Sequence, residues 1–224
     1  MITTELRYNR TSLKDFISVQ KRSVMESSRQ QKINHFYSLC NYNAPVLDVG
    51  VSGYDEYNPQ VNFFLNNFRL PSYQYTGLAV EPVAGLKLKY PDKDFVEYPG
   101  DYFPFKENEF DWIFSNAVIE HVGGEEEQVL FINEMLRVGK NVFFTTPNKY
   151  FPVESHTDVF FRHWFPKSFY KWCSRNHSYY SQDNLKLLSY WDLHRLLKKS
   201  EAKSYNIYLN KLMSLTMTFS VVIR

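Results

Sequence analysis

Short apolar runs alternate with helical stretches along most of the chain after residue 44. The runs that predict strands occupy residues 44–53, 75–82, 94–98, 109–119 and 141–147. Between them, residues 60–68 and 127–138 carry apolar side chains at helical spacing. Strands that alternate with helices predict βαβ units, and hence a mostly parallel sheet with helices on both faces.

The two ends of the chain follow other patterns. We expect residues 1–43 to form a helical segment that packs on a single domain of residues 44–224. Within that domain, residues 148–185 are aromatic, carry histidines and lack a regular period. So long a segment inside a compact domain predicts a lid or binding loop. A further helix and two closing strands are predicted over residues 191–199, 205–212 and 217–224.

Composition narrows the class of protein. Apolar residues make up 44% and charged residues 22% of the chain, which is typical of a globular protein. The net charge of +2 and the lack of a basic stripe argue against a nucleic-acid partner. No stretch approaches the roughly 20 apolar residues of a membrane span, and the N-terminus lacks the apolar core of a signal peptide. We therefore expect a cytoplasmic protein whose partner is a small molecule.

The turn after the first predicted strand combines an acid with small residues. Asp48 ends the strand, and Gly50, Ser52 and Gly53 follow it. A carboxylate here would repel a pyrophosphate, and the glycine motifs of phosphate-binding loops are absent. A ligand with an ammonium or sulfonium group suits Asp48 better. The alternative is a simple turn whose aspartate caps a helix.

Acids also follow the second and third predicted strands. Glu81 stands where a carboxylate can accept hydrogen bonds from both hydroxyls of a ribose. Asp101 is placed to accept a hydrogen bond from an adenine amine, with Tyr102 and Phe103 beside the ring. Each acid alone has a plainer interpretation as a solvated or turn residue. Together with Asp48 they predict a pocket for a cationic, adenine-bearing ligand at one edge of the sheet.

Four segments resemble the class I S-adenosylmethionine-dependent methyltransferases: VLDVGVSG, LAVEP, YPGDYFPFKENEFDWIFSNAVIEHVG and FINEMLRVGKNVFFTTPNKYFPVESHT. The resemblance covers roughly residues 44–165 and is nearest to the small type-11-like subgroup associated with bacterial surface-glycan biosynthesis. It implies a Rossmann-like methyltransferase fold, which is an α/β, doubly wound, mostly parallel seven-stranded sheet with a reversed last strand. It also implies S-adenosylmethionine as the cofactor.

The resemblance also implies a set of cofactor-binding positions at the strand ends. By matching positions these are Asp48, Gly50 and Ser52 for the methionine part, Glu81 for the ribose, Asp101 and Tyr102 for the adenine, and Ser115, Asn116 and Ala117 beside the sulfonium. The chain departs from the family in the first turn. Ser52 replaces the common second glycine, and Gly53 stands one position later.

Methyl transfer is an in-line displacement, so the protein mainly positions the reacting groups. A hydroxyl nucleophile also benefits from a general base. The candidates are His121, which follows the fourth strand, and His156 in the predicted lid, with Glu154 placed to orient its imidazole. The alternatives are packing and helix capping for His121, and a pair with Glu154 that only holds the lid closed for His156. Glu120 is a further candidate base, with a helix-dipole role as its alternative.

A metal site built from Glu154, His156 and His163 matches no defined spacing, and Mg²⁺ prefers carboxylates and water, so no metal is expected. The predicted lid carries basic side chains at Arg162, Lys167, Lys171 and Arg175. They suggest an anionic acceptor, unless they form an ordinary solvated face. The expected activity is methylation on oxygen of a small acceptor. We expect that acceptor to be a sugar, nucleotide sugar or phosphorylated precursor of a surface polysaccharide. N-methylation of a small amine and non-catalytic cofactor binding are the alternatives.

Overall fold

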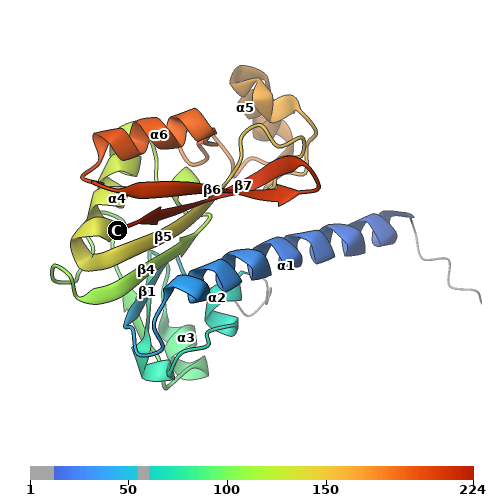
Figure 1. The fold of residues 1–224 in the computed structure, drawn as a ribbon. Coiled ribbons are helices and arrows are strands. Elements are labelled where there is room, and N and C mark those ends of the chain that lie inside the picture. Colours follow the sequence, from blue (N-terminus) through green and yellow to red (C-terminus); the bar gives the residue numbers. More distant parts are fainter. Residues whose placement is uncertain (1–12, 55–60) are drawn as a thin grey trace, which may run out of the picture.

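The strands form one sheet in the order β3-β2-β1-β4-β5-β7-β6 (Figure 1). The computed structural model describes residues 13–54 and 61–224, with side chains from residue 20 onward. Within this part of the chain the strands are β1 (Val46–Val49), β2 (Tyr75–Ala79), β3 (Asp94–Glu97), β4 (Phe110–Asn116), β5 (Gly139–Pro147), β6 (Tyr205–Leu212) and β7 (Leu215–Ile223). Residues 1–12 of the predicted N-terminal segment and Gln60 of the predicted 60–68 helix lie outside the described residues.

The direction of the strands confirms the predicted architecture. β1 pairs in parallel with β2 and β4, and β3 and β5 extend the parallel sheet on either side. β7 then runs antiparallel to both β5 and β6. The strand order reverses between β1 and β4, where the chain crosses from one half of the sheet to the other. Ligands of open α/β sheets bind at the carboxyl ends of the strands beside such a reversal.

Helices cover both faces of the sheet (Figure 1). One face is covered by α4 (Glu125–Val138) and α6 (Tyr190–Lys199), whose apolar side chains pack with alternate residues of β1, β4 and β5. The other face is covered by α1 (Leu13–Leu39), α2 (Phe63–Asn66) and α3 (Ala84–Lys89). The sheet is therefore buried on both faces, which explains why consecutive apolar residues stand at the centre of β4 and β5.

The second half of α1 packs on the sheet, whereas its first half extends beyond it (Figure 1). Ile33 and Phe36 are fully buried, and Phe36 makes edge contacts with the rings of Phe114 and Phe143. This anchor sets the position of the polar residues one and two turns before it. Lys32 and Arg29 are thereby brought over the carboxyl ends of the central strands.

Residues 148–188 contain an unpredicted helix, α5 (Pro166–Asn176). Phe169 and Cys173, one turn apart on this helix, pack with Leu185 in a small core of their own. A bridge between Asn148 and Leu188 joins the two ends of this segment just beyond β5. Among the described residues, no helix combines the length and the apolar character needed to cross a membrane.

Candidate active site

Asp48 lies at the carboxyl end of β1, in the wall of a small cavity that Gly50, Asn116 and the α1 residue Arg29 also line. The carboxylate is 7% exposed and accepts a hydrogen bond of 2.6 Å from the Tyr75 hydroxyl. Burial raises the pKa of Asp48 to about 7, although this hydrogen bond opposes the shift. A buried carboxylate with a raised pKa is stabilised in its charged form by a cation, so the cavity favours a positively charged ligand.

The first turn (residues 48–53) has room for glycine only at two positions. Gly50 has a φ of +92°, and a Cβ there would lie 2.3 Å from Cγ2 of Val118. At Gly53 a Cβ would lie 2.2 Å from the backbone oxygen of Pro82. Ser52 is not among the described residues with positive φ, so the backbone accepts a side chain there. The second glycine of the turn therefore stands at position 53 rather than 52, because it is residue 53 whose backbone passes close to the Pro82 carbonyl.

Side-chain hydrogen bonds hold this turn in place. Asn62, which precedes α2, accepts from the Ser52 amide and donates to the Ser52 carbonyl, each at 2.8 Å. The carboxylate of Glu81 accepts from the Ser52 hydroxyl at 2.7 Å and from the Gly53 amide at 2.9 Å. Both bonds end on Oε2 of Glu81, so the structure joins Ser52 to the candidate ribose acid. No sequence motif indicated Asn62.

The remaining predicted cofactor positions differ in exposure. Asp101 and Tyr102 follow β3 and are exposed. Phe103, which we expected beside an adenine ring, is instead buried at 3% exposure and packs on Phe131 and Tyr98. Its ring therefore belongs to the core, and its backbone amide donates to the Glu134 carboxylate at 2.7 Å.

The end of β4 separates the small cavity from a larger one. The Ser115 hydroxyl donates to the carbonyl of Val49 at 3.1 Å and so ties β4 to β1. Asn116 lines both cavities, and its Oδ1 accepts from the Thr145 hydroxyl at 2.8 Å. Ala117 has a φ of +58° and lines the larger cavity. Asn116 therefore stands between the two cavities.

This second cavity has a volume of about 580 Å³ and is named the large cavity. It lies between α1, the end of β5, the segment 151–163 and the β6–β7 hairpin, and its wall is mainly apolar. A cavity of this size and character is typical of a small-molecule site, which usually encloses roughly 300–1,000 Å³. The basic residues predicted to hold an anionic ligand do not line it: these are Arg162, Lys167, Lys171 and Arg175.

Basic side chains of α1 line the large cavity instead. Lys32 is 6% exposed, and Lys21 and Arg29 lie on the same wall. Burial and the charge of Arg29 lower the pKa of Lys32 to about 8, against the opposing effect of Glu120. These residues were missed because they lie in a helix whose polar positions look like an ordinary solvated face. Only the burial of the helix against the sheet distinguishes them.

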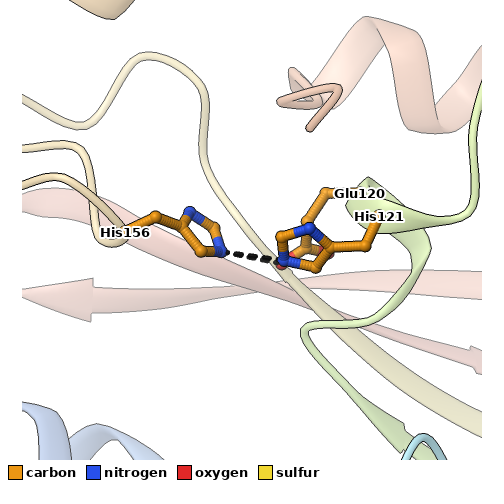
Figure 2. A group of neighbouring side chains, drawn as sticks. All are labelled: Glu120, His121 and His156. Carbon is orange, nitrogen blue, oxygen red and sulfur yellow. Dashed lines mark hydrogen bonds and ion pairs between the residues drawn. The ribbon is translucent and has the colours of Figure 1, made fainter. Parts of the chain in front are cut away.

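A polar cluster of Glu120, His121, Glu154 and His156 lies beside the large cavity, which Glu154 and His156 line. Figure 2 shows three of its members, Glu120, His121 and His156. Glu120 and His121 belong to the short helix η3 (Ile119–His121) directly after β4. The segment after β5 brings His156 toward them, with its Nε2 3.1 Å from Nε2 of His121. The structure thus places the predicted His121, His156 and Glu154 together. His163, also considered with them, bonds to the Phe151 carbonyl at 2.8 Å instead.

Glu154 holds the imidazole of His156. Its carboxylate lies 2.6 Å from Nδ1 of His156, and it also accepts from the amide and hydroxyl of Thr157. Burial favours the neutral acid, but the hydrogen bonds from His156 and Thr157 outweigh it and lower the pKa of Glu154 to about 2. Burial likewise opposes a charge on His156, yet the pKa of His156 is raised by Glu154 and by the charge of Glu120.

Comparison with known proteins relates this chain to methyltransferases. Residues 62–142 match the methyltransferase domain family. A search of curated proteins found no match. The fold is similar to a Thermotoga maritima S-adenosylmethionine-dependent methyltransferase described as a possible histamine N-methyltransferase, with a TM-score of 0.54 and 11% identity. That alignment covers 93% of this chain and 95% of the other.

Two similar structures contain a product of the cofactor together with a small molecule. One is Burkholderia thailandensis 1,6-didemethyltoxoflavin-N1-methyltransferase with 1,6-didemethyltoxoflavin and S-adenosylhomocysteine, at a TM-score of 0.55, 17% identity and coverage of 94% of this chain and 85% of the other. The other is Haemonchus contortus phosphoethanolamine N-methyltransferase 2 with phosphomonomethylethanolamine and S-adenosylhomocysteine. Its TM-score is 0.51 and its identity 18%, and the alignment covers 80% of this chain and 38% of the other. The matched domain and shared fold support an S-adenosylmethionine-dependent methyltransferase, with S-adenosylmethionine as its cofactor.

Proposed function

We propose that this protein methylates a hydroxyl group of a small anionic acceptor, with S-adenosylmethionine as the methyl donor. The observation that carries the proposal is the junction of the two cavities at Asn116. The small cavity offers a buried acid to a cationic cofactor, and the large cavity has room for a second small molecule. We place that acceptor among sugars, nucleotide sugars and phosphorylated precursors of a surface polysaccharide.

The cofactor-binding residues are proposed as follows from their places at the strand ends. Asp48 attracts the cationic methionine part, and Gly50 lets the backbone approach it. Glu81 accepts from the ribose hydroxyls, since the first turn occupies only its Oε2 and leaves Oε1 available. Further positions are Asp101 and Tyr102 at the adenine, and Ser115, Asn116 and Ala117 around the sulfonium.

When bound, S-adenosylmethionine supplies the methyl group: its S–CH₃ bond breaks as the O–CH₃ bond forms, and the sulfonium becomes a neutral thioether. The chain contributes mainly position, which supplies up to roughly 7–11 kcal/mol in well-oriented systems. His156 and Glu154 line the large cavity, and His121 contacts His156, so we propose that the acceptor hydroxyl loses its proton at this cluster. Residues 148–185 are proposed as the lid that encloses this site.

An anionic acceptor is favoured by Lys32, a basic side chain of α1 on the mainly apolar wall of the large cavity. Lys32 is nearly buried, and the structure gives its ammonium no hydrogen-bond partner among the described residues. A phosphate or carboxylate in the cavity would provide one. The phosphorylated ligand of the Haemonchus contortus enzyme is of this chemical class. The N-methyltransferases among the similar structures favour methylation of nitrogen as the second candidate.

The activity is tested by incubating the protein with S-adenosylmethionine labelled in the methyl group and a panel of small acceptors. The panel pairs nucleotide sugars and sugar phosphates with their unphosphorylated counterparts and with small amines. We expect label in the phosphorylated alcohols, on oxygen, as located by mass spectrometry and NMR of the product. Label on nitrogen would replace the proposal by its alternative. Tight cofactor binding without turnover on the panel and on cell extract would indicate a non-catalytic binding protein.

Replacement of Lys32 by methionine is expected to raise KM for the anionic acceptor about 10–100-fold, because a charge-assisted hydrogen bond contributes roughly 1.5–3 kcal/mol. The kcat is expected to change much less. The matched control is Lys171→Met, which removes an exposed lysine outside the large cavity. The KM values of both variants, measured by steady-state kinetics, show whether α1 or the proposed lid of residues 148–185 binds the anion. A larger effect at Lys171 would contradict our assignment.

A further inference from the structure

The two histidines of the polar cluster face each other in a way that neutral imidazoles do not tolerate. Nδ1 of His121 lies 3.0 Å from the backbone oxygen of Asn184, which can only accept, so this nitrogen carries the proton. Nδ1 of His156 likewise donates to the Glu154 carboxylate at 2.6 Å. In a neutral imidazole the second nitrogen then bears a lone pair. Two such lone pairs, on the Nε2 atoms, would face each other across 3.1 Å, so either a proton on one of these atoms or a metal ion between them must bridge the two rings (Figure 2).

Glu120 shows what kind of cation fits. Its side chain is fully buried, and Oε2 accepts from the Thr146 hydroxyl at 2.9 Å. Oε1 has no hydrogen-bond partner in the described part of the chain, which is costly for a buried carboxylate. It lies 4.0 Å from Nε2 of His156. One proton shared by the two histidines would leave this oxygen without a partner, whereas a metal ion binds all three atoms.

The surroundings of the cluster match those of metal-bound histidines. Such histidines almost always donate their second ring N–H to a carboxylate or a backbone carbonyl, which fixes the tautomer and orients the ring. Here Glu154 does this for His156, and the Asn184 carbonyl does it for His121. The hydroxyl and amide of Thr157 hold Glu154 in turn. Both Nε2 atoms are thereby presented to the same point.

We propose that Glu120, His121 and His156 bind a divalent transition-metal ion. One ligand atom from each residue lies within 4.8 Å of the other two. Two imidazole nitrogens and one carboxylate suit Zn²⁺, Mn²⁺ or Fe²⁺, whereas Mg²⁺ and Ca²⁺ prefer oxygen ligands. The proposed site differs from our expectation from the sequence that no metal is bound. It also differs from the set considered there, because Glu154 serves as an outer partner and His163 takes no part.

The metal site deepens the proposed function and, in this role, rests on it. Three protein ligands leave coordination positions free, as in catalytic rather than structural metal sites. His156 lines the large cavity, so an acceptor oxygen there is within reach of the ion. Coordination to a divalent cation makes a hydroxyl easier to deprotonate. The polar cluster would thus activate the acceptor through the ion, and the proton would leave to water.

The test is metal titration of the full-length protein, stripped with a chelator, by calorimetry with ZnCl₂ and with MnCl₂. We expect one ion per chain. Glu120→Gln and His156→Ala are expected to weaken binding at least 100-fold, and Glu154→Gln roughly 10–100-fold, the effect typical of an outer partner. The matched control is His163→Asn, a histidine on the wall of the same cavity but outside the cluster, which should bind as the unmodified chain does.

Circular dichroism and S-adenosylmethionine binding confirm that each variant is folded. The inference is overturned if the unmodified protein shows no saturable binding of either ion, or if Glu120→Gln binds equally well. A proton shared by the histidines would then explain the cluster. Because the titration uses neither cofactor nor acceptor, its outcome is separate from that of the proposed function. Binding of an ion without methyl transfer would refute only the function, and transfer by a protein that binds no ion would refute only the metal site.

Discussion

Asp48→Asn is expected to weaken S-adenosylmethionine binding about 10–100-fold and to stabilise the ligand-free protein. The cofactor loses the buried charge that attracts its cationic methionine part, at roughly 1.5–3 kcal/mol. The asparagine still offers an oxygen to the Tyr75 hydroxyl, so the fold keeps this hydrogen bond. Calorimetric titration with the cofactor and urea unfolding of the ligand-free protein measure the two effects.

The stability gain depends on pH in a defined direction. The pKa of Asp48 is raised from 3.8 to about 7 in the folded state. Between these values the folded state binds more protons than the unfolded state, so this group lowers the free energy of unfolding as pH rises. This decrease in the free energy of unfolding is complete above pH 7 and amounts to roughly 2–4 kcal/mol. We therefore expect the free energy of unfolding of Asp48→Asn to exceed that of the unmodified protein most at pH 8, and to equal it near pH 4.

Cofactor affinity follows the opposite direction. A proton on Asp48 competes with the cationic cofactor, so affinity is expected to fall as pH decreases below about 7. The Asp48→Asn variant provides the control, because the titration of the cofactor's own groups and of the neighbouring Arg29, Tyr37 and Tyr75 remains in it. Equal affinity and equal pH dependence of the two proteins would remove Asp48 from the cofactor site.

Glu81→Ala is expected to weaken cofactor binding by about 1–3 kcal/mol, or roughly 5–150-fold, if both ribose hydroxyl bonds are lost. It also frees the Ser52 hydroxyl and the Gly53 amide, from which Glu81 accepts in the ligand-free protein. Part of the loss therefore arises from the turn itself. Glu81→Gln separates the two contributions, because its amide oxygen still accepts from the turn while the carboxylate is gone.

Calorimetry compares both variants with Glu126→Ala, which removes an exposed acid in the first turn of α4. We expect the glutamine to bind more weakly than the unmodified chain and the alanine most weakly of all. The Glu126 variant should bind normally. If the alanine variant keeps full affinity, the ribose is bound elsewhere, and the acid at the end of β2 serves the turn alone.

The sheet was predictable because both of its faces are buried. Strands such as β4 and β5 then carry a short run of consecutive apolar residues at their centre, residues 112–114 and 142–144, which a sequence displays directly. Helices with a small buried face left no such pattern. α3 buries only Leu86, and α5 buries only Phe169 and Cys173, so neither presents a recognisable apolar stripe.

The candidate site was predictable where it depends on strand ends and less so where it depends on distant packing. Asp48 lies within β1 near its carboxyl end and Glu81 lies two residues after β2, so their place is set by local sequence. The position of Lys32 depends on the packing of α1, and that of Asn184 on the path of a long segment after β5. Phe103 was misplaced for a similar reason, because its burial depends on Phe131 of α4. Contacts between elements far apart in sequence carry no local signal.

A crystal structure of the protein grown with saturating S-adenosylhomocysteine tests the central claim most directly. We expect the ligand at the carboxyl ends of β1 and β4, with its amino-acid part beside Asp48, its ribose on Glu81 and its sulfur facing the large cavity past Asn116. An empty crevice, or the ligand bound away from both acids, would contradict the assignment of this chain's site to methyl transfer.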